Sequence, residues 1–182
     1  TQNITLPAES AGVWHDPVDI YRLINNMGPS ILESTPKRHA TIGAQAYAPI
    51  TSPLRRYSDF LNMAQVVAQL TGQGRLLTQE DLENLLPLLS ARAEITGQVQ
   101  RLRTRYWKYE YFRQHSKTKR WSGIIVDANS GLSTVALPAI QLFLKAPRKI
   151  FGDKIRLGQG FSLRIGKVDP LAGEIKIIEA WE

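Results

Sequence analysis

The 182-residue chain contains no cysteine, so disulfides, thiol catalysis and Cys-ligated zinc or iron–sulfur sites are all excluded. No apolar run approaches the ~20 residues needed to cross a bilayer. The first ten residues, TQNITLPAES, also lack the basic and then apolar pattern of a secretory signal. We therefore expect no membrane partner.

Acidic residues are also scarce, with 16 Asp and Glu against 23 Lys and Arg, for a formal net charge of +7. This excess favours polyanionic partners, nucleic acid first and an acidic membrane surface second, although a merely basic soluble protein stays an alternative. The excess is concentrated: nine Lys and Arg lie from Arg92 to Arg120, against Glu94 and Glu110. Hydrophobic residues make up 43% of the chain, enough for a buried core.

The first two thirds of the chain predict helices. Asp16 and Pro17 have the pattern of a helix cap and first residue, so we interpret HDPVD as a helix start rather than a metal site. A second helix is predicted from Asp59, with Ser58 as its cap and Gly72 as its stop. Its apolar residues recur at helical spacing: Phe60, Met63, Ala64, Val67 and Leu70.

Two further helices are predicted after this one. Thr78 and Asp81 form a capping-box pattern that opens a short helix ending at Pro87. A long helix is predicted from Leu88 to about Gln114.

The last sixty residues predict short strands, at 121–128, 132–140, 142–150, 161–168 and 174–180, the last two joined as a hairpin by DPLAG. Five such strands favour a small barrel of the OB-fold type. The predicted fold class is thus α+β, a helical segment followed by a five-stranded OB-fold β-barrel. The predicted domains are 1–118 and 119–182.

The stretch from Tyr47 to Asp59, YAPITSPLRRYSD, has the features of an anion-binding site. Arg55 and Arg56 stand just before a helix, whose N-terminus presents unpaired N–H groups and partial positive charge. The Arg fork matches two phosphate oxygens. The alternative is that the arginines pair with Asp59 and that Ser58 only caps the helix.

The longer stretch HATIGAQAYAPITSPLRRYSDF resembles the signature of the ribonuclease II family of exoribonucleases. The matching residues, in order, are His39, Tyr47, Thr51, Ser52, Pro53, Leu54, Arg55, Arg56, Tyr57 and Asp59. Met63 and Ala64 stand where family members usually have His-Arg. The resemblance extends to the architecture, the end of a catalytic domain followed by a long helix and an OB-fold.

This resemblance implies a hydrolase that degrades single-stranded RNA from the 3′ end. It places Arg55 beside the scissile phosphate as the catalytic arginine, with RNA-binding residues around it at Tyr47, Thr51, Ser52 and Arg56. The family's Mg²⁺ is held by aspartates upstream of this motif. We therefore expect a C-terminal fragment that is inactive alone and that contains no metal ligand.

The predicted long helix interleaves cations and aromatics. Arg101, Arg105 and Lys108 share one face and are predicted to contact RNA, while Trp107 and Tyr111 are predicted to face the core. In the barrel, Trp121 and Phe161 are expected in the core. The barrel surface is expected either to contact the RNA backbone or to have a purely structural role.

The sequence thus predicts RNA degradation as part of an exoribonuclease, with single-stranded RNA as partner. A non-catalytic RNA-binding module and an OB-fold that binds protein are the alternatives. We expect a cytoplasmic location, with an organelle as the alternative, and homodimerisation of the fragment stays an open hypothesis.

Overall fold

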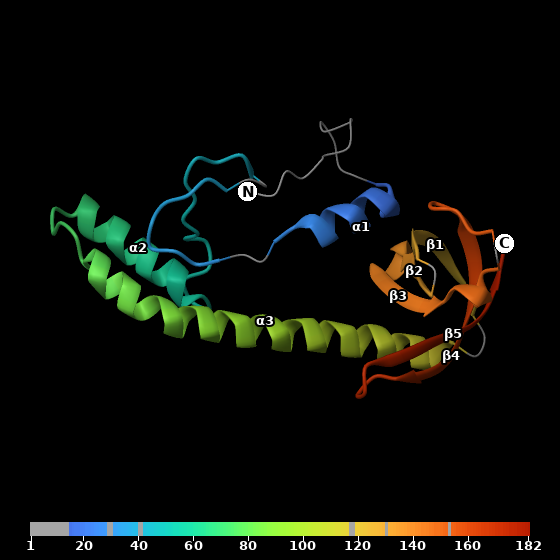
Figure 1. Cartoon of the computed structure of the whole chain (residues 1–182). Coiled ribbons are helices and arrows are strands. Elements are labelled where there is room, and N and C mark those ends of the chain that lie inside the picture. Colours follow the sequence, from blue (N-terminus) through green and yellow to red (C-terminus); the bar gives the residue numbers. More distant parts are fainter. Residues whose placement is uncertain (1–14, 29–30, 40–41, 117–118, 130, 153) are drawn as a thin grey trace. The chain divides into compact units, whose positions relative to one another are not determined.

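The computed structural model describes residues 15–28, 31–39, 42–116, 119–129, 131–152 and 154–182. In these ranges the α-helices are α1 (Pro17–Asn26), α2 (Tyr57–Leu70) and α3 (Gln79–His115) (Figure 1). The strands are β1 (Trp121–Ala128), β2 (Leu132–Leu137), β3 (Leu142–Pro147), β4 (Gly160–Asp169) and β5 (Glu174–Trp181). Short 3₁₀ helices follow β2 (η2, Pro138–Ile140) and β3 (η3, Arg148–Ile150). The α+β prediction is confirmed.

The chain forms two compact units. The barrel unit comprises Thr1–Gly28 and Gln100–Glu182, and the motif unit comprises Pro29–Val99. The predicted division of the sequence at residue 118 into domains stays a prediction.

In the barrel unit, α1 begins as predicted. The Asp16 carboxylate accepts a hydrogen bond of 2.8 Å from the Val18 amide, and Pro17 occupies the first turn. Val18 is buried against Val126 and Ala136 of the barrel. The HDPVD segment is therefore a helix start.

In the motif unit, α2 begins at Tyr57 with Arg56 as its N-cap residue, so the prediction that Ser58 caps this helix is wrong. The Ser58 hydroxyl donates instead to the Asp59 carboxylate at 3.4 Å. Gly72 follows the helix at a φ of 74°, a conformation that glycine adopts without strain, so the predicted stop is confirmed. The helical spacing of the apolar residues holds, but Phe60, Met63, Val67 and Leu70 are exposed.

The capping box before α3 is confirmed. The Thr78 amide donates to Asp81 Oδ2 at 2.8 Å, and the Asp81 amide donates to Thr78 Oγ1 at 3.1 Å. A hydrogen bond from the Thr78 hydroxyl to Asp81 Oδ2 at 2.6 Å, and secondarily the bond from the Thr78 amide, lower the pKa of the Asp81 carboxyl. The prediction that this helix ends at Pro87 is wrong, because one helix of 37 residues runs through it. Proline inside a helix costs about 3 kcal/mol, but Pro87 is exposed, where water can hydrate the unpaired carbonyl.

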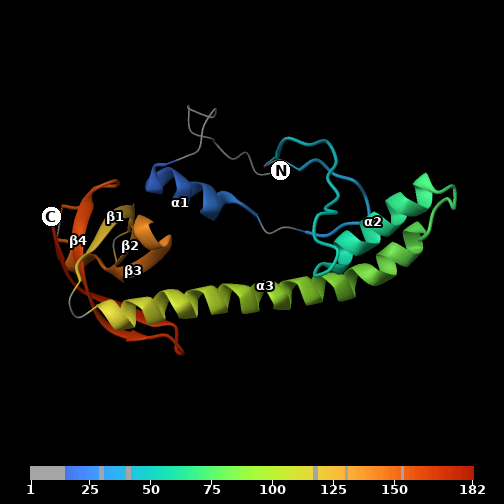
Figure 2. The same ribbon diagram turned by 180° about the vertical axis from the view of Figure 1, so that it is seen from behind.

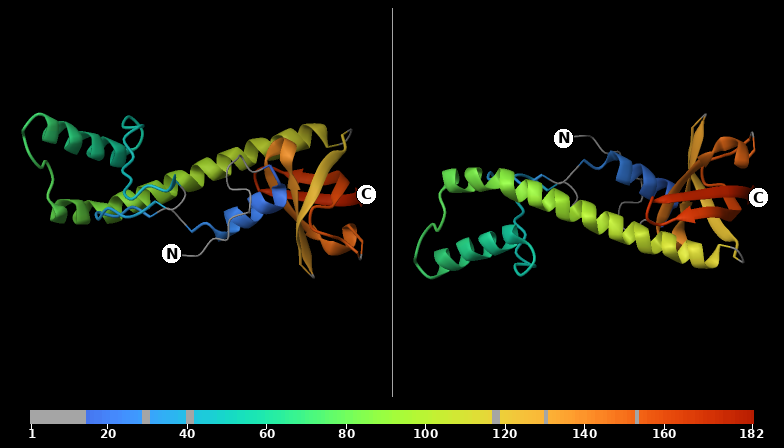
Figure 3. Two further views of the ribbon diagram at one scale, coloured as in Figure 1. Left: turned by 90° about the horizontal axis from the view of Figure 1, so that it is seen from above. Right: turned by 90° about the horizontal axis from the view of Figure 1, so that it is seen from below.

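The five strands form an antiparallel sheet in the order β3-β2-β1-β4-β5. A bulge between Ile125 and Asp127 bends β1. β3 and β5 approach each other at the two edges of the sheet, which gives the nearly closed OB-type barrel that was predicted. β4 and β5 form the expected hairpin (Figure 3), in whose turn Asp169 Oδ1 accepts from the Leu171 and Ala172 amides.

The barrel core is built from alternating residues of the strands, among them Ile125, Val135 and Leu163, none of them exposed. Trp121 and Phe161 also lie in this core, as predicted. The opposite face of β1–β3 is covered by α1, which is why these strands are apolar on both faces (Figure 2).

The last turns of α3 contribute Tyr109 and Phe112 to the core, with Phe112 fully buried. The Phe112 ring lies 4.5 Å from that of Trp121, centroid to centroid. The prediction that Trp107 and Tyr111 face the core is wrong, since they are 60% and 41% exposed. Burial raises the pKa of Tyr109, against an opposing effect of the Arg105 charge. Among the described helices, none is both long and apolar enough to cross a bilayer.

Glu110 on this helix gives a pH prediction. Hydrogen bonds from Arg113 at 2.7 Å, and secondarily from Gln114, lower the pKa of Glu110 from 4.5 to about 2. Because the folded-state pKa is depressed, the stabilisation is complete above pH 4.5 and is lost as the pH falls towards 2. We expect Glu110→Gln to remove this part of the acid dependence of thermal unfolding. An NMR titration of the Glu110 carboxyl with a midpoint near 4.5 would contradict it.

Candidate functional site

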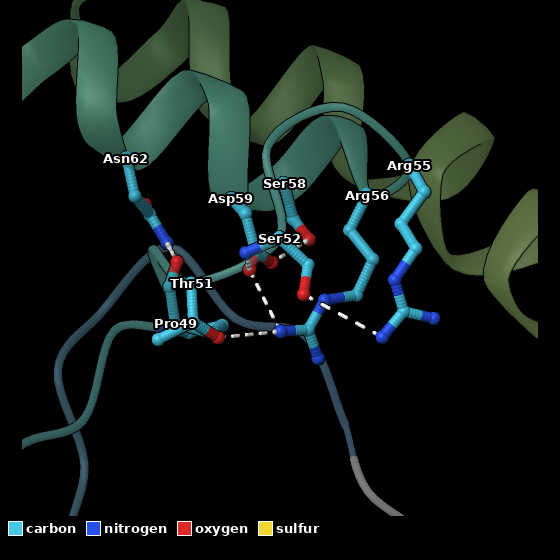
Figure 4. Close-up of polar contacts among 8 residues, drawn as sticks. All are labelled: Pro49, Thr51, Ser52, Arg55, Arg56, Ser58, Asp59 and Asn62. Atoms are coloured by element: carbon cyan, nitrogen blue, oxygen red, sulfur yellow. Dashed lines mark hydrogen bonds and ion pairs between the residues drawn. The ribbon is translucent and has the colours of Figure 1, made fainter.

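The sequence Thr51–Arg56 forms a tight turn that leads into α2 (Figure 4). The Ser52 carbonyl accepts hydrogen bonds from the amides of both arginines, at 3.2 Å from Arg55 and 2.9 Å from Arg56. These bonds wrap the chain so that Thr51, Ser52 and both arginines lie together. The structure thus brings four of the predicted site residues into one place.

The Asp59 carboxylate holds this turn in position. It lies at 0% exposure, in the first turn of α2, and its Oδ2 accepts from the Ser52 amide at 3.0 Å. The same oxygen pairs with Arg56 Nη2 at 2.8 Å (Figure 4). A buried carboxylate requires such partners, because an unpaired charge in the interior is costly. Asp59 is therefore a positioning residue.

The two arginines are held very differently. Arg56, 44% exposed, is fixed by Asp59 and by Thr51 Oγ1, to which it donates at 3.1 Å. Arg55 is exposed, and within the described part of the chain its guanidinium makes one long hydrogen bond, of 3.5 Å, to Ser52 Oγ. The alternative that the arginines pair with Asp59 thus holds for Arg56. Arg55 keeps its guanidinium available to a ligand.

A second contact ties the chain before the turn to α2. Asn62 Nδ2 donates to the Pro49 carbonyl at 3.0 Å. Our sequence reasoning missed Asn62, whose only signal is an amide one turn after Asp59. The Tyr47 ring is exposed and meets the His39 ring edge-on at 5.1 Å. The His39 amide donates to the Ala44 carbonyl at 2.9 Å, so this histidine and tyrosine flank a short loop.

The arrangement is suited to an anion. The Arg56 side chain does not cap the N–H groups of α2, and the Asp59 amide of the first turn donates to the Arg56 carbonyl at 3.1 Å. Arg55 immediately precedes the N-cap residue of this helix, whose N-terminus carries a partial positive charge. A phosphate at this point would receive a bidentate hydrogen bond from Arg55.

The predicted cations of α3 lie in the barrel unit. Lys108 Nζ donates to the Gln141 carbonyl at 2.6 Å. The Arg105 guanidinium lies against Gly173, where an added Cβ would come within 2.7 Å of it. Arg105 and Lys108 therefore contact the barrel, and Arg101 is exposed one turn before Arg105. Their RNA-binding role stays a prediction.

The described residues hold no group of three or more His, Asp or Glu side chains that could bind a metal ion. Asp19, the one other acid of HDPVD, pairs with Arg22 at 3.5 Å.

Residues 11–72 match the RNB domain family. This match and the relatives below support membership of the RNB-type ribonuclease II family.

The chain is 30% identical over 148 residues to an uncharacterized ribonuclease of Synechocystis sp., covering 80% of this chain and 22% of the relative. It is 30% identical over 179 residues to the mitochondrial exoribonuclease II of Saccharomyces cerevisiae, covering 91% of this chain and 18% of that protein. The structure is similar to that of the Dss1 exoribonuclease of Candida glabrata, solved as an active-site mutant. The TM-score is 0.73 and the identity 25%, over 88% of this chain and 21% of the other. The chain thus spans about a fifth of the length of these relatives.

Proposed function

We propose that the chain acts as part of a hydrolytic exoribonuclease that degrades single-stranded RNA from its 3′ end. Residues 1–118 supply the end of the catalytic domain, and residues 119–182 supply an OB-fold that binds RNA. The observation that supports this most directly is the turn before α2, where Asp59 fixes Arg56 and leaves Arg55 extended beside a helix N-terminus. The ribonuclease and exoribonuclease names of the relatives agree with this proposal.

In this proposal, Arg55 contacts the scissile phosphate. Its planar fork holds two phosphate oxygens and stabilises the negative charge that builds on them during attack by water. Arg56, Thr51 and Ser52 shape the same pocket, and Tyr47 flanks it. The aspartates that would hold the family's Mg²⁺, and with it the means to activate water, lie outside this sequence, so in this proposal the chain alone binds RNA without cleaving it.

The cations of the barrel unit add attraction for the RNA backbone. Arg101, Arg105 and Lys108 lie on the same helix as Arg92, Arg103 and Arg113. Contacts of this kind release counterions, so affinity is expected to fall steeply with salt. We propose action in the cytoplasm, or in an organelle as the name of the yeast relative states for that protein.

The test is the affinity of this chain for labelled single-stranded RNA at two salt concentrations. We expect Arg55→Ala to weaken binding about tenfold, the equivalent of one charge-assisted hydrogen bond, and to reduce the salt slope by about 0.7. Arg55→Lys should recover only part of this loss, because an ammonium lacks the fork.

The matched control is Arg75→Ala, which removes an exposed arginine from a loop of the same unit. Equal losses in the Arg55 and Arg75 variants would contradict the proposed site. RNA cleavage by the chain alone would contradict the inactivity proposed for it, and absence of binding at low salt would contradict an RNA partner.

A further inference from the structure

A groove lies within the barrel unit, between the C-terminal half of α3 and the barrel. It has a volume of about 1050 Å³. One wall is α3, and the other is formed by the start of β1, the end of β2 and η2. Its lining includes four cations and three aromatic side chains: Arg103, Lys108, Lys119, Arg120, Trp107, Tyr111 and Trp121.

The charge in this groove is of one sign. The lining residues of the described chain include no Asp or Glu beside the four cations. Lys119 Nζ lies 4.6 Å from the Trp121 ring centroid and 5.9 Å from that of Tyr111, so its charge stands over the aromatic faces. The groove therefore favours an anion.

Two of the three aromatic side chains, Trp107 and Tyr111, lie at the surface, whereas Trp121 is buried in the barrel core. Trp107 is 60% exposed, although leaving its ring in water forgoes the stabilisation that burial would give. The Tyr106 ring meets it edge-on at 5.2 Å and so supports one side of the indole. Tyr111 is 41% exposed and meets Trp121 edge-on at 5.8 Å. Because the His115 ring lies 4.3 Å from the Tyr111 ring, centroid to centroid, and Trp121 is buried, Trp107 is the ring that is most open to a flat ligand.

The surface that OB-folds commonly offer to oligonucleotides is occupied in this chain. Oligonucleotides usually lie across the strand 2–3 face of such barrels. Here α1 covers that side, through Val18 on Val126 and Ala136 and through Tyr21, whose ring lies 5.1 Å from Phe143. The groove on the α3 side is lined by neither α1 nor β3.

We infer that this groove is a stacking subsite for single-stranded RNA, in which Trp107 is the principal base platform. The inference rests on the proposed function and extends it to residues outside the family motif. Alternation of ring faces and cations matches the alternation of bases and phosphates in a single strand. An acidic peptide would use the cations but would leave the exposed Trp107 face without a partner, so RNA is the better fit.

The experiment compares the full chain with its Trp107→Ala and Trp107→Phe forms. The probes are a 12-nucleotide oligoadenylate and an abasic ribose-phosphate oligomer of equal length. We expect Trp107→Ala to weaken oligoadenylate binding about tenfold, with little change for the abasic oligomer. Trp107→Phe should retain most of the affinity. Leu102→Ala, at an exposed position of the same helix outside the groove, serves as the matched control.

Two outcomes would overturn the stacking subsite and leave the proposed function standing. In one, Trp107→Ala loses affinity equally for both oligomers. In the other, Trp107→Ala loses no affinity while Arg55→Ala still weakens binding. Displacement of oligoadenylate by polyglutamate at equal charge concentration would also overturn it, in favour of a peptide site. If the unaltered chain binds neither oligomer at low salt, the subsite and the proposed function fail together.

Discussion

Replacing Phe112 with alanine is expected to lower the free energy of unfolding of the barrel unit by about 3–5 kcal/mol. Phe112 is fully buried, where the last turns of α3 meet the barrel, and its ring packs on Trp121 at 4.5 Å. The substitution removes the apolar area and leaves a cavity between helix and sheet. Urea denaturation followed by circular dichroism would measure the change.

The matched control is Trp107→Ala, which removes a larger ring from the same helix five positions earlier. Because Trp107 is mostly exposed, its loss should cost less than about 1 kcal/mol. A similar cost for the two substitutions would show that α3 does not pack into the barrel as described. If Phe112→Ala fails to fold, Phe112→Leu should still lose more unfolding free energy than the control, although less than Phe112→Ala would.

Replacing Asp59 with asparagine is expected to destabilise the motif unit by about 2 kcal/mol. The substitution keeps the size of the side chain but removes the negative charge from the oxygen that accepts from Ser52 and Arg56. Exposure of Arg56 to water reduces the cost below that of a fully buried pair. Faster hydrogen exchange of the Ser52 amide would report the loosened turn directly.

Asp59→Asn should also weaken RNA binding, since it releases the turn that positions Arg55. Asp19→Asn is the matched control, because Asp19 pairs with Arg22 at a more exposed position. Its effect on stability should lie between 0 and about 1 kcal/mol. Unchanged exchange at Ser52 in Asp59→Asn would mean that the carboxylate does not organise the site.

The exposed apolar side chains of α2 bear on the open hypothesis of dimerisation. Phe60, Met63 and Leu70 lie at the surface of the described motif unit. An exposed apolar face of this kind favours burial against another protein surface. Light scattering at high concentration would distinguish a homodimer from a monomer.

The caps show how far local sequence determines this protein. Asp16 with Pro17 and Thr78 with Asp81 were predicted correctly because each cap is a bond between residues two or three positions apart. Ser58 was assigned wrongly as a cap because its hydroxyl donates to the Asp59 carboxylate. That carboxylate is buried and bonded to the Ser52 amide, a contact that the local pattern does not reveal. Pro87 was predicted to end a helix because proline usually interrupts one. The residues on both sides of Pro87 nevertheless continue a single helix.

The sequence by itself determined the family motif, the helical segments apart from their division at Pro87, the five strands and the charge, since each of these is encoded within a few neighbouring positions. Only the tertiary structure decided which aromatics of α3 are buried. Heptad-like spacing defines faces of a helix but not which face the barrel covers, so Trp107 was placed inside and Tyr109 was not. The groove likewise joins Arg103 to Ile140, residues that meet only after the helix has packed on the sheet. Which side chains line the groove depends on contacts between segments that are distant in sequence.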